Sequence, residues 1–183
     1  LQISLMKDEK AKSELEVDIN EMTSMLDSYV SFVKTESPEP IETIIINELI
    51  GDIVKTVEKN GVELTIKEKN TIQTSGRQIQ LKRAFNNIID NSQRYAKKIE
   101  IILYTNEKDC VIEFNDDGEG IPRDKYEDVF KPFFTLDPSR NKLKGESGLG
   151  LTITRDIIRS HGGDVKLSDS NLGGLQLKVL LPL

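Results

Sequence analysis

Two asparagines, Asn87 and Asn91, stand four residues apart in the stretch NNIIDNSQRYA, residues 86–96. In a helix, residues at positions i and i+4 lie on the same face, so the two amides would be neighbours. Asparagine is a mediocre helix former, because its side chain competes for backbone hydrogen bonds. Two amides on one face of a half-apolar helix therefore predict a polar group outside the helix that meets them.

The stretch NDDGEGIP, residues 115–122, is a second candidate for ligand chemistry, at the end of an expected strand. Asp116 and Asp117 supply carboxylates, which only accept hydrogen bonds when ionised. Gly118 and Gly120 let the backbone turn sharply and approach a ligand closely. Taken alone, the stretch is equally compatible with an ordinary Asp-Gly turn between a strand and a helix.

The third candidate is GESGLGLTITRDII, in which Gly148 and Gly150 open an amphipathic helix. The first N–H groups of a helix and its dipole favour an anion at that end. The preceding residues 131–147 carry four basic residues against two acidic ones. This pattern suits a phosphate-binding loop that covers its ligand. A solvated loop before an ordinary helix is the alternative.

Other nucleotide-binding motifs are missing from the sequence. There is no GxxxxGK[ST], which excludes a P-loop protein. Ile153 stands where a dinucleotide-binding fingerprint needs its third glycine. The HRD and DFG motifs of eukaryotic-type protein kinases are also missing.

The composition is that of a globular chain, with 37% hydrophobic and 31% charged residues. A net charge of −6, from 31 acids and 25 bases, argues against nucleic acid as a partner, since nucleic acid requires a basic surface. No apolar run approaches the roughly 20 residues of a membrane span, and no signal peptide opens the chain. The one cysteine, Cys110, lies in an apolar run and is expected to be a buried thiol. We expect this part of the protein to be cytoplasmic.

Hydrophobic periodicity predicts the elements that position these motifs. Strands are expected over residues 41–45, 62–66, 99–105, 110–115, 165–167 and 175–181. Longer helices are expected over residues 47–57, 78–95 and 148–161, with Asn47 as a possible N-cap and a short helix after Pro122. A mixed sheet with three helices on one face is an α+β fold, a two-layer α/β sandwich.

The first 37 residues are expected to be a separate domain, because Pro38 and Pro40 interrupt the helical pattern. Apolar residues recur there with the 4-3 spacing of a coiled coil: Leu15, Ile19, Met22, Leu26, Tyr29 and Val33. One helix cannot bury such a stripe, whereas a helical hairpin that pairs with a second copy forms a four-helix bundle. Residues 1–37 are thus predicted as a dimerisation hairpin and residues 38–183 as the α/β domain. The alternative is a helix lying on its own domain.

Four motifs follow one another in a characteristic order, namely Asn87-x3-Asn91-x2-Arg94-Tyr95, Asp116-x-Gly118-x-Gly120, Phe130-x-Pro132-Phe133-Phe134 and Gly148-Leu149-Gly150-Leu151. This order resembles the N, G1, F and G2 boxes of bacterial sensor histidine kinases. Their ATP-binding domain has the Bergerat (GHKL) fold shared with gyrase and MutL. The runs KRA before the asparagines and RYA after them most resemble the EnvZ-like branch. The resemblance covers essentially the whole chain.

The resemblance implies roles for individual residues in binding ATP or ADP. Asn91 would coordinate Mg2+ through its amide oxygen, and a cation that keeps most of its waters needs only one such ligand from the protein. Asp116 would accept a hydrogen bond from the exocyclic amine of adenine. Residues 131–147 would form a lid over the nucleotide. The remaining expected nucleotide contacts are Asn87, Arg94, Tyr95, Gly118, Gly120, Ile121, Phe133, Lys142, Gly148, Leu149, Gly150 and Leu151.

The resemblance also exposes an absence. These kinases phosphorylate a histidine in a motif resembling H-E-L-R-T-P, and no such motif is present. The sole histidine, His161, stands before Gly162 at an expected helix end and is expected to help end that helix. The phosphoacceptor is therefore expected upstream of residue 1. The resemblance further implies a response regulator as partner, a homodimer through residues 1–37, and a parent protein anchored in the bacterial inner membrane.

Three residues depart from the common pattern of these kinases. Asp117 stands where many members have asparagine, Arg77 where an acid is frequent, and Glu146 where glycine is frequent. Two other functions remain open from sequence. One is a GHKL-type ATPase in which Asp90 activates water, and the other is a degenerate kinase that acts as an interaction scaffold.

Overall fold

The structure, a computed structural model, describes residues 19, 23, 39–56, 61–136 and 148–183. Along these residues the elements are β1 (Glu42–Ile45), α2 (Ile46–Thr56), β2 (Glu63–Glu68), β3 (Gln73–Gly76), α3 (Gln78–Tyr95), β4 (Lys98–Thr105), β5 (Asp109–Asp116), the 3-10 turns η3 (Arg123–Lys125) and η4 (Asp128–Phe130), α5 (Gly150–Ser160), β6 (Asp164–Asp169) and β7 (Leu175–Pro182). None of the helices in these ranges combines the length and apolar character needed to cross a membrane.

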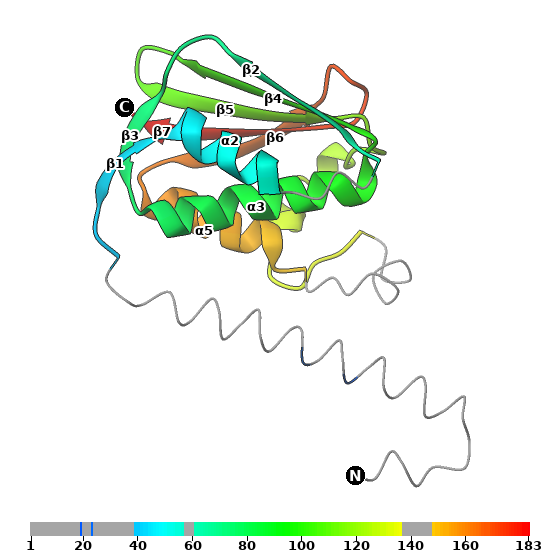
Figure 1. Ribbon diagram of the computed structural model, residues 1–183. Helices are drawn as coiled ribbons and strands as arrows, with labels where there is room; N and C mark the ends of the chain where they lie inside the picture. Colours follow the sequence, from blue (N-terminus) through cyan, green and yellow to red (C-terminus); the bar gives the residue numbers. More distant parts are fainter. Residues whose placement is uncertain (1–18, 20–22, 24–38, 57–60, 137–147) are drawn as a thin grey trace, which may run out of the picture.

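A five-stranded sheet in the order β2-β4-β5-β7-β6 forms one layer of the domain. Its first pair, β2 and β4, is parallel, and the other neighbouring pairs are antiparallel. The helices α2, α3 and α5 form the second layer on one face of the sheet (Figure 1). The predicted two-layer sandwich is confirmed for the residues the structure describes. The predicted helical hairpin lies outside them, apart from Ile19 and Thr23.

The core lies between these two layers, because alternate residues of each strand face the helices. On β4 and β5 the buried side chains include Ile101, Leu103, Ile112 and Phe114. From the other layer, Phe85 of α3 packs on Phe114 with ring centroids 6.1 Å apart. This packing holds α3 against the sheet and leaves Asn87 and Asn91 half buried.

The polar strand β3 and the position of Asn47 were not expected from sequence. β3 pairs with β1 in a separate two-stranded sheet. Asn47 is no N-cap, because it lies inside α2. Its Oδ1 accepts a hydrogen bond from the Ile72 N–H (2.7 Å), and its Nδ2 donates to the Asn70 carbonyl oxygen (3.2 Å). Asn47 therefore fixes the loop between β2 and β3 rather than the start of its own helix.

The N-terminus of α3 is capped by an acidic residue that is distant in the sequence. Arg77, at the N-cap position, makes no side-chain cap, and the first turn of α3 contains no acidic residue. Glu39 instead accepts hydrogen bonds from the N–H groups of Ile79 (2.5 Å) and Gln80 (3.3 Å). A carboxylate at this end satisfies two otherwise unpaired donors and complements the helix dipole. Arg77 has a different task, since its Nη2 donates to the Ser160 Oγ (2.8 Å) at the end of α5.

His161 joins the same two helix ends. Its Nε2 accepts a hydrogen bond from the Arg77 N–H (3.0 Å), and its Nδ1 lies 2.7 Å from the Ile157 carbonyl oxygen. Both contacts are satisfied only by the neutral ring with its proton on Nδ1. Burial lowers the pKa of His161, the hydrogen bond to the Ile157 carbonyl oxygen opposes this effect, and Arg77 (lowering) and Glu39 (raising) make smaller contributions. Gly162 follows with φ of 77°, the left-handed conformation expected there.

Protonation of His161 is expected to destabilise the domain. Because the folded-state pKa is depressed, the stabilisation is complete above the unfolded pKa, near 6.5, and is lost as the pH falls through the folded pKa. A protonated Nε2 would face the Arg77 N–H donor to donor, so we expect a loss of about 1 kcal/mol. Chemical denaturation between pH 7 and pH 5 measures it. His161→Gln should lack this component of the pH dependence, and equal slopes for both proteins would refute the assignment.

Candidate nucleotide-binding site

Asp116, at the end of β5, is held in one orientation by its neighbours. The side chain is 5% exposed. Its Oδ1 accepts hydrogen bonds from the N–H groups of Gly118 (3.0 Å) and Leu175 (2.9 Å). Its Oδ2 lies 3.5 Å from the Ser92 hydroxyl of α3, at the limit of a hydrogen bond. The two backbone donors thus engage Oδ1, while Oδ2 is the oxygen with acceptor capacity to spare.

Burial and hydrogen bonding act in opposite directions on this carboxyl. Desolvation raises the pKa of Asp116, and the backbone N–H groups of Leu175 and Gly118 partly offset the rise because they favour the charged form. A buried carboxylate supported by fixed donors is the arrangement required of a specific acceptor. The arrangement is consistent with the predicted role of Asp116.

Two glycines crowd around Asp116 where no side chain would fit. A Cβ on Gly118 would lie 3.0 Å from the Tyr95 carbonyl oxygen and 3.1 Å from the Asp116 Oδ1. A Cβ on Gly174, in the turn between β6 and β7, would overlap both the Asp116 Oδ1 and the Gly118 nitrogen. The Gly174 N–H also donates to the Asp116 carbonyl oxygen (3.1 Å). Gly174 was missed from sequence, where only the NLGG turn at residues 171–174 could have indicated it.

Asp117 does not add a second carboxylate to the site, although it stands next to Asp116 in the sequence. Its Oδ1 accepts hydrogen bonds from the N–H groups of Lys97 and Lys98, both at 2.7 Å. These donors lower the pKa of Asp117. The residue therefore fixes the turn between α3 and β4, a contact that an asparagine side-chain oxygen could also make.

The two asparagines have different surroundings. The Asn87 Nδ2 donates to the Gly150 carbonyl oxygen (3.3 Å), so the first amide is met by the opening turn of α5. Asn91, one turn later on α3, is half buried. Within the described residues, no hydrogen bond to its side chain is found. Its amide oxygen is thus available to a ligand or a cation.

Arg94 and Tyr95 lie in the last turn of α3, next to the glycine turn that follows β5. The closeness of the Tyr95 carbonyl oxygen to Gly118 shows that these segments touch. Tyr95 is 40% exposed, and Arg94 is also exposed. Ile121 is partly buried against the core. The contacts that Arg94, Tyr95 and Ile121 make with a nucleotide stay predictions.

Phe133 lies close to Gly148, two residues before the start of α5. Phe133 has φ of 63°, and its N–H donates to the Gly148 carbonyl oxygen (3.1 Å). A Cβ on Gly148 would lie 2.9 Å from the Phe133 Cα and carbonyl carbon. Gly148 itself has φ of 63°, and α5 starts at Gly150 rather than at the predicted residue 148.

Of the remaining expected contacts, Leu149 is 7% exposed and belongs to the core, so only its backbone could meet a ligand. Leu151 is half buried and packs against the same core. Gly120 adopts φ of 70° in the turn after β5, as its predicted role requires. Lys142 and most of the predicted lid, residues 137–147, lie outside the described residues.

Comparison with known proteins gives the family. The family model for histidine kinase-, DNA gyrase B- and HSP90-like ATPases matches residues 76–183, which include all four motifs. The chain belongs to this family. This match, together with the sensor histidine kinases to which the chain is similar, confirms the expectation of an ATP-binding catalytic domain of a sensor histidine kinase.

Curated relatives of this histidine kinase domain are themselves sensor kinases. The sensor histidine kinase CpxA of Escherichia coli K12 is 31% identical over 182 residues, covering 95% of this chain and 40% of CpxA. The sensor histidine kinase GtrS of Pseudomonas aeruginosa is 29% identical over 184 residues, covering 100% of this chain and 38% of GtrS. The chain thus spans two fifths or less of the length of these relatives.

Solved structures support the fold of the domain. A mycobacterial sensor histidine kinase, MprB, superposes with a TM-score of 0.69 at 24% identity, covering 78% of this chain and 97% of that one. The catalytic domain of the histidine kinase ThkA gives a TM-score of 0.68 at 22% identity, covering 78% and 95%. These similarities confirm the Bergerat-type sandwich predicted from the four motifs.

Proposed function

We propose that this domain binds ATP with Mg2+ and delivers the γ-phosphoryl group to a histidine outside this sequence, from which an aspartate of a response regulator receives it. The observation that carries the proposal is the fixed acceptor Asp116. Its Oδ1 is committed to two backbone donors, and its Oδ2 is oriented by the fold before any ligand arrives.

An acceptor in this position selects adenine over guanine. The exocyclic amine of adenine donates a hydrogen bond, whereas guanine presents a carbonyl oxygen at the equivalent position. A buried carboxylate facing another acceptor would be left unpaired, which costs about 1–3 kcal/mol or more. The fixed carboxylate therefore supports ATP rather than GTP as the ligand.

The phosphates would lie at the start of α5, where the first N–H groups have no acceptor within the helix. Asn87 holds this turn against α3 through the Gly150 carbonyl oxygen. Asn91 would hold Mg2+ through its amide oxygen, the kind of hard oxygen donor that this cation accepts beside water and phosphate. When bound, the cation would neutralise phosphate charge, and transfer then depends on positioning by the chain.

The proposal also assigns roles to residues 1–37 and to the rest of the parent protein. Residues 1–37 would form the helical hairpin that dimerises and meets the response regulator, and residues 38–183 the catalytic domain. The heptad pattern of the first segment supports this division. The sole histidine, His161, is engaged at the junction of α5 and α3, which supports a phosphoacceptor elsewhere. The parent protein would be anchored in the bacterial inner membrane, with this part cytoplasmic.

Calorimetric titration of Asn91→Ala with a non-hydrolysable ATP analogue tests the metal role. The wild-type protein should bind more tightly with Mg2+ than with EDTA. The variant should lose about tenfold or more in affinity with Mg2+ and little in EDTA, because it lacks the amide ligand.

Asn86→Ala is the matched control, since Asn86 lies on the same helix but on a different face from Asn91. It should keep the Mg2+ dependence of the wild type. Full Mg2+ dependence in Asn91→Ala would refute the role of the residue. An absence of binding by the wild-type protein at millimolar analogue would refute the proposed function.

A further inference from the structure

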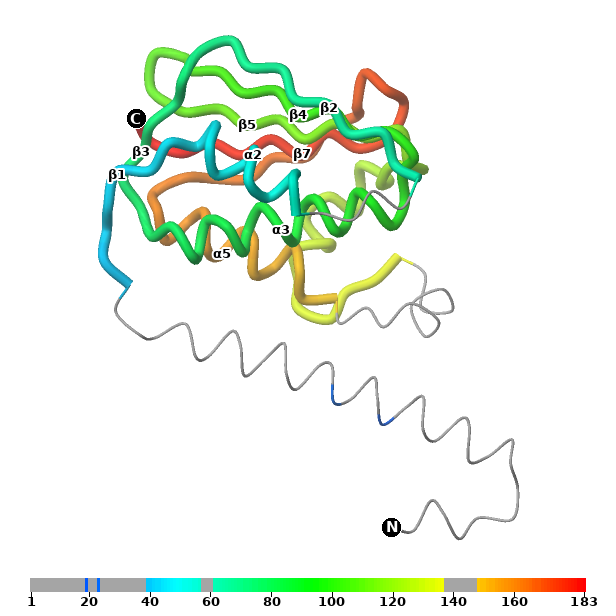
Figure 2. The backbone as a smooth tube through the Cα atoms, in the orientation of Figure 1, coloured from blue at the N-terminus to red at the C-terminus, as the bar shows by residue number. Residues whose placement is uncertain are grey.

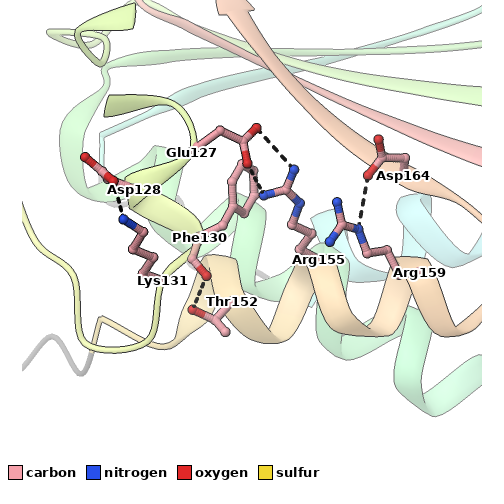
Figure 3. Close-up of polar contacts among 8 residues, drawn as sticks. All are labelled: Glu127, Asp128, Phe130, Lys131, Thr152, Arg155, Arg159 and Asp164. Carbon is pink, nitrogen blue, oxygen red and sulfur yellow. Dashed lines mark hydrogen bonds and ion pairs between the residues drawn. The ribbon is translucent and has the colours of Figure 1, made fainter. Parts of the chain in front are cut away.

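Residues 122–134, here named the connecting segment, run from the glycine turn after β5 to the close approach of Phe133 and Gly148. Figure 2 traces the chain from β5 through this segment. The segment contains η3 and η4 but no longer helix or strand, so its position depends on side-chain contacts with neighbouring elements. Two side chains of α5, Arg155 and Thr152, contact the segment (Figure 3).

Arg155 binds the connecting segment in two ways. Its Nη1 and Nη2 pair with the two carboxylate oxygens of Glu127, at 2.8 Å and 3.2 Å. Its guanidinium carbon lies 4.2 Å from the centroid of the Phe130 ring, which it covers. The Arg155 side chain is 14% exposed and Phe130 is 7% exposed. A planar fork that pairs with a carboxylate and stacks on a ring is a property of arginine that lysine lacks.

A second contact reinforces the first. The Thr152 hydroxyl, one turn before Arg155 on α5, donates to the Phe130 carbonyl oxygen (3.0 Å). Residues three apart share a helix face, so Thr152 and Arg155 both contact Phe130 of η4 from the same face of α5. Only two residues, Lys131 and Pro132, separate Phe130 from Phe133, whose N–H donates to the Gly148 carbonyl oxygen. The contacts that Arg155 and Thr152 make with η4 therefore also restrict the position of Phe133, which binds Gly148.

We propose that Arg155, paired with Glu127, is a positioning residue for the phosphate end of the nucleotide site. It fixes the connecting segment on α5, which holds Phe133 against Gly148 and so sets the geometry of the first turn of the helix. The proposal rests on the proposed placement of phosphates at that turn. Arg155 itself touches neither Asp116 nor Asn91 in the contacts of the described residues.

Loss of the Arg155–Glu127 pair is expected to shift the connecting segment more than it lowers the stability of the domain. The Glu127 side chain is 78% exposed, and an ion pair with an exposed partner contributes little to folding. A small displacement of binding groups can nevertheless reduce affinity strongly, because the ligand requires a defined geometry. The decisive readout is therefore the affinity for the phosphate-bearing ligand relative to the affinity for the base alone.

The test compares Arg155→Met, Arg155→Lys and Glu127→Gln with Arg159→Met. Arg159 is a matched control, since it lies one turn later on α5 and pairs with Asp164 of β6 (3.4 Å). Hydrogen exchange of the amides of Phe133, Phe134 and residues 148–153 is measured without nucleotide. Affinities for a non-hydrolysable ATP analogue with Mg2+ and for adenosine are measured by titration.

In Arg155→Met we expect faster exchange at these amides and an affinity for the ATP analogue reduced about fivefold or more, with adenosine changed less than about twofold. Arg155→Lys and Glu127→Gln should show the same pattern to a smaller extent, and Arg159→Met should match the wild type. Unchanged exchange, or equal losses for both ligands, would overturn the proposal. Failure of the wild-type protein to bind the analogue would instead refute the proposed function on which the Arg155 proposal rests.

Discussion

Asp116→Asn is expected to weaken binding of an ATP analogue by about 10- to 100-fold while the domain stays folded. The N–H groups of Gly118 and Leu175 both donate to the Asp116 Oδ1, so they will hold the amide oxygen of the variant in that place. The amide nitrogen must then occupy the position of Oδ2. There it would present a donor to the adenine amine, which is itself a donor. Calorimetric titration with the analogue measures the loss.

Asp117→Asn is the matched control for this substitution. The substitution is the same and the residue is adjacent, but the Asp117 carboxylate accepts hydrogen bonds from the N–H groups of Lys97 and Lys98. An amide oxygen can accept the same hydrogen bonds. Its affinity should stay within about twofold of the wild type. The Asp116→Asn variant should also bind a GTP analogue relatively better, since its new donor can meet the guanine carbonyl. Equal losses in both variants would contradict the assigned base contact.

Gly174→Ala is expected to reduce both stability and binding. The added methyl group would overlap the Asp116 Oδ1 and the Gly118 nitrogen, which are held by backbone and cannot turn aside. Overpacking of this kind destabilises by about 3 kcal/mol. The shift of Asp116 that relieves the overlap would misplace the base acceptor, so we expect about 100-fold weaker binding of the ATP analogue. Chemical denaturation and calorimetry measure the two effects.

The neighbouring glycine separates crowding from backbone strain. Gly173 has φ of 102°, which disfavours a side chain, but a Cβ there meets nothing within 4 Å. Gly173→Ala should therefore cost about 1–3 kcal/mol through strain alone and leave the affinity of the folded protein nearly unchanged. If Gly173→Ala weakened nucleotide binding as much as Gly174→Ala, contact between the turn and Asp116 would not be the cause.

The elements that build the site were largely predictable from local pattern. Helix α3 has the predicted bounds, residues 78–95, because a repeating apolar face and the turn residues around it are properties of neighbouring positions. The strands β4 and β5 were found for the same reason, since alternation along a strand is local. The four motifs were recognisable because each is defined by residue types at short, fixed separations in the sequence. Strand β3 was missed, since its residues QTSG carry no such alternation and it forms by pairing with β1.

What each polar side chain binds was decided only by the tertiary structure. Asn47 binds the backbone near residue 72, Glu39 caps a helix that begins at Gln78, and Asp116 is oriented by the N–H of Leu175. Pattern along the chain was enough to assign the family, most helices and strands around the site, and the residue types available for nucleotide chemistry. Hydrogen-bond partners distant in sequence meet only when the layers pack, and a one-dimensional pattern does not encode which donor reaches which acceptor.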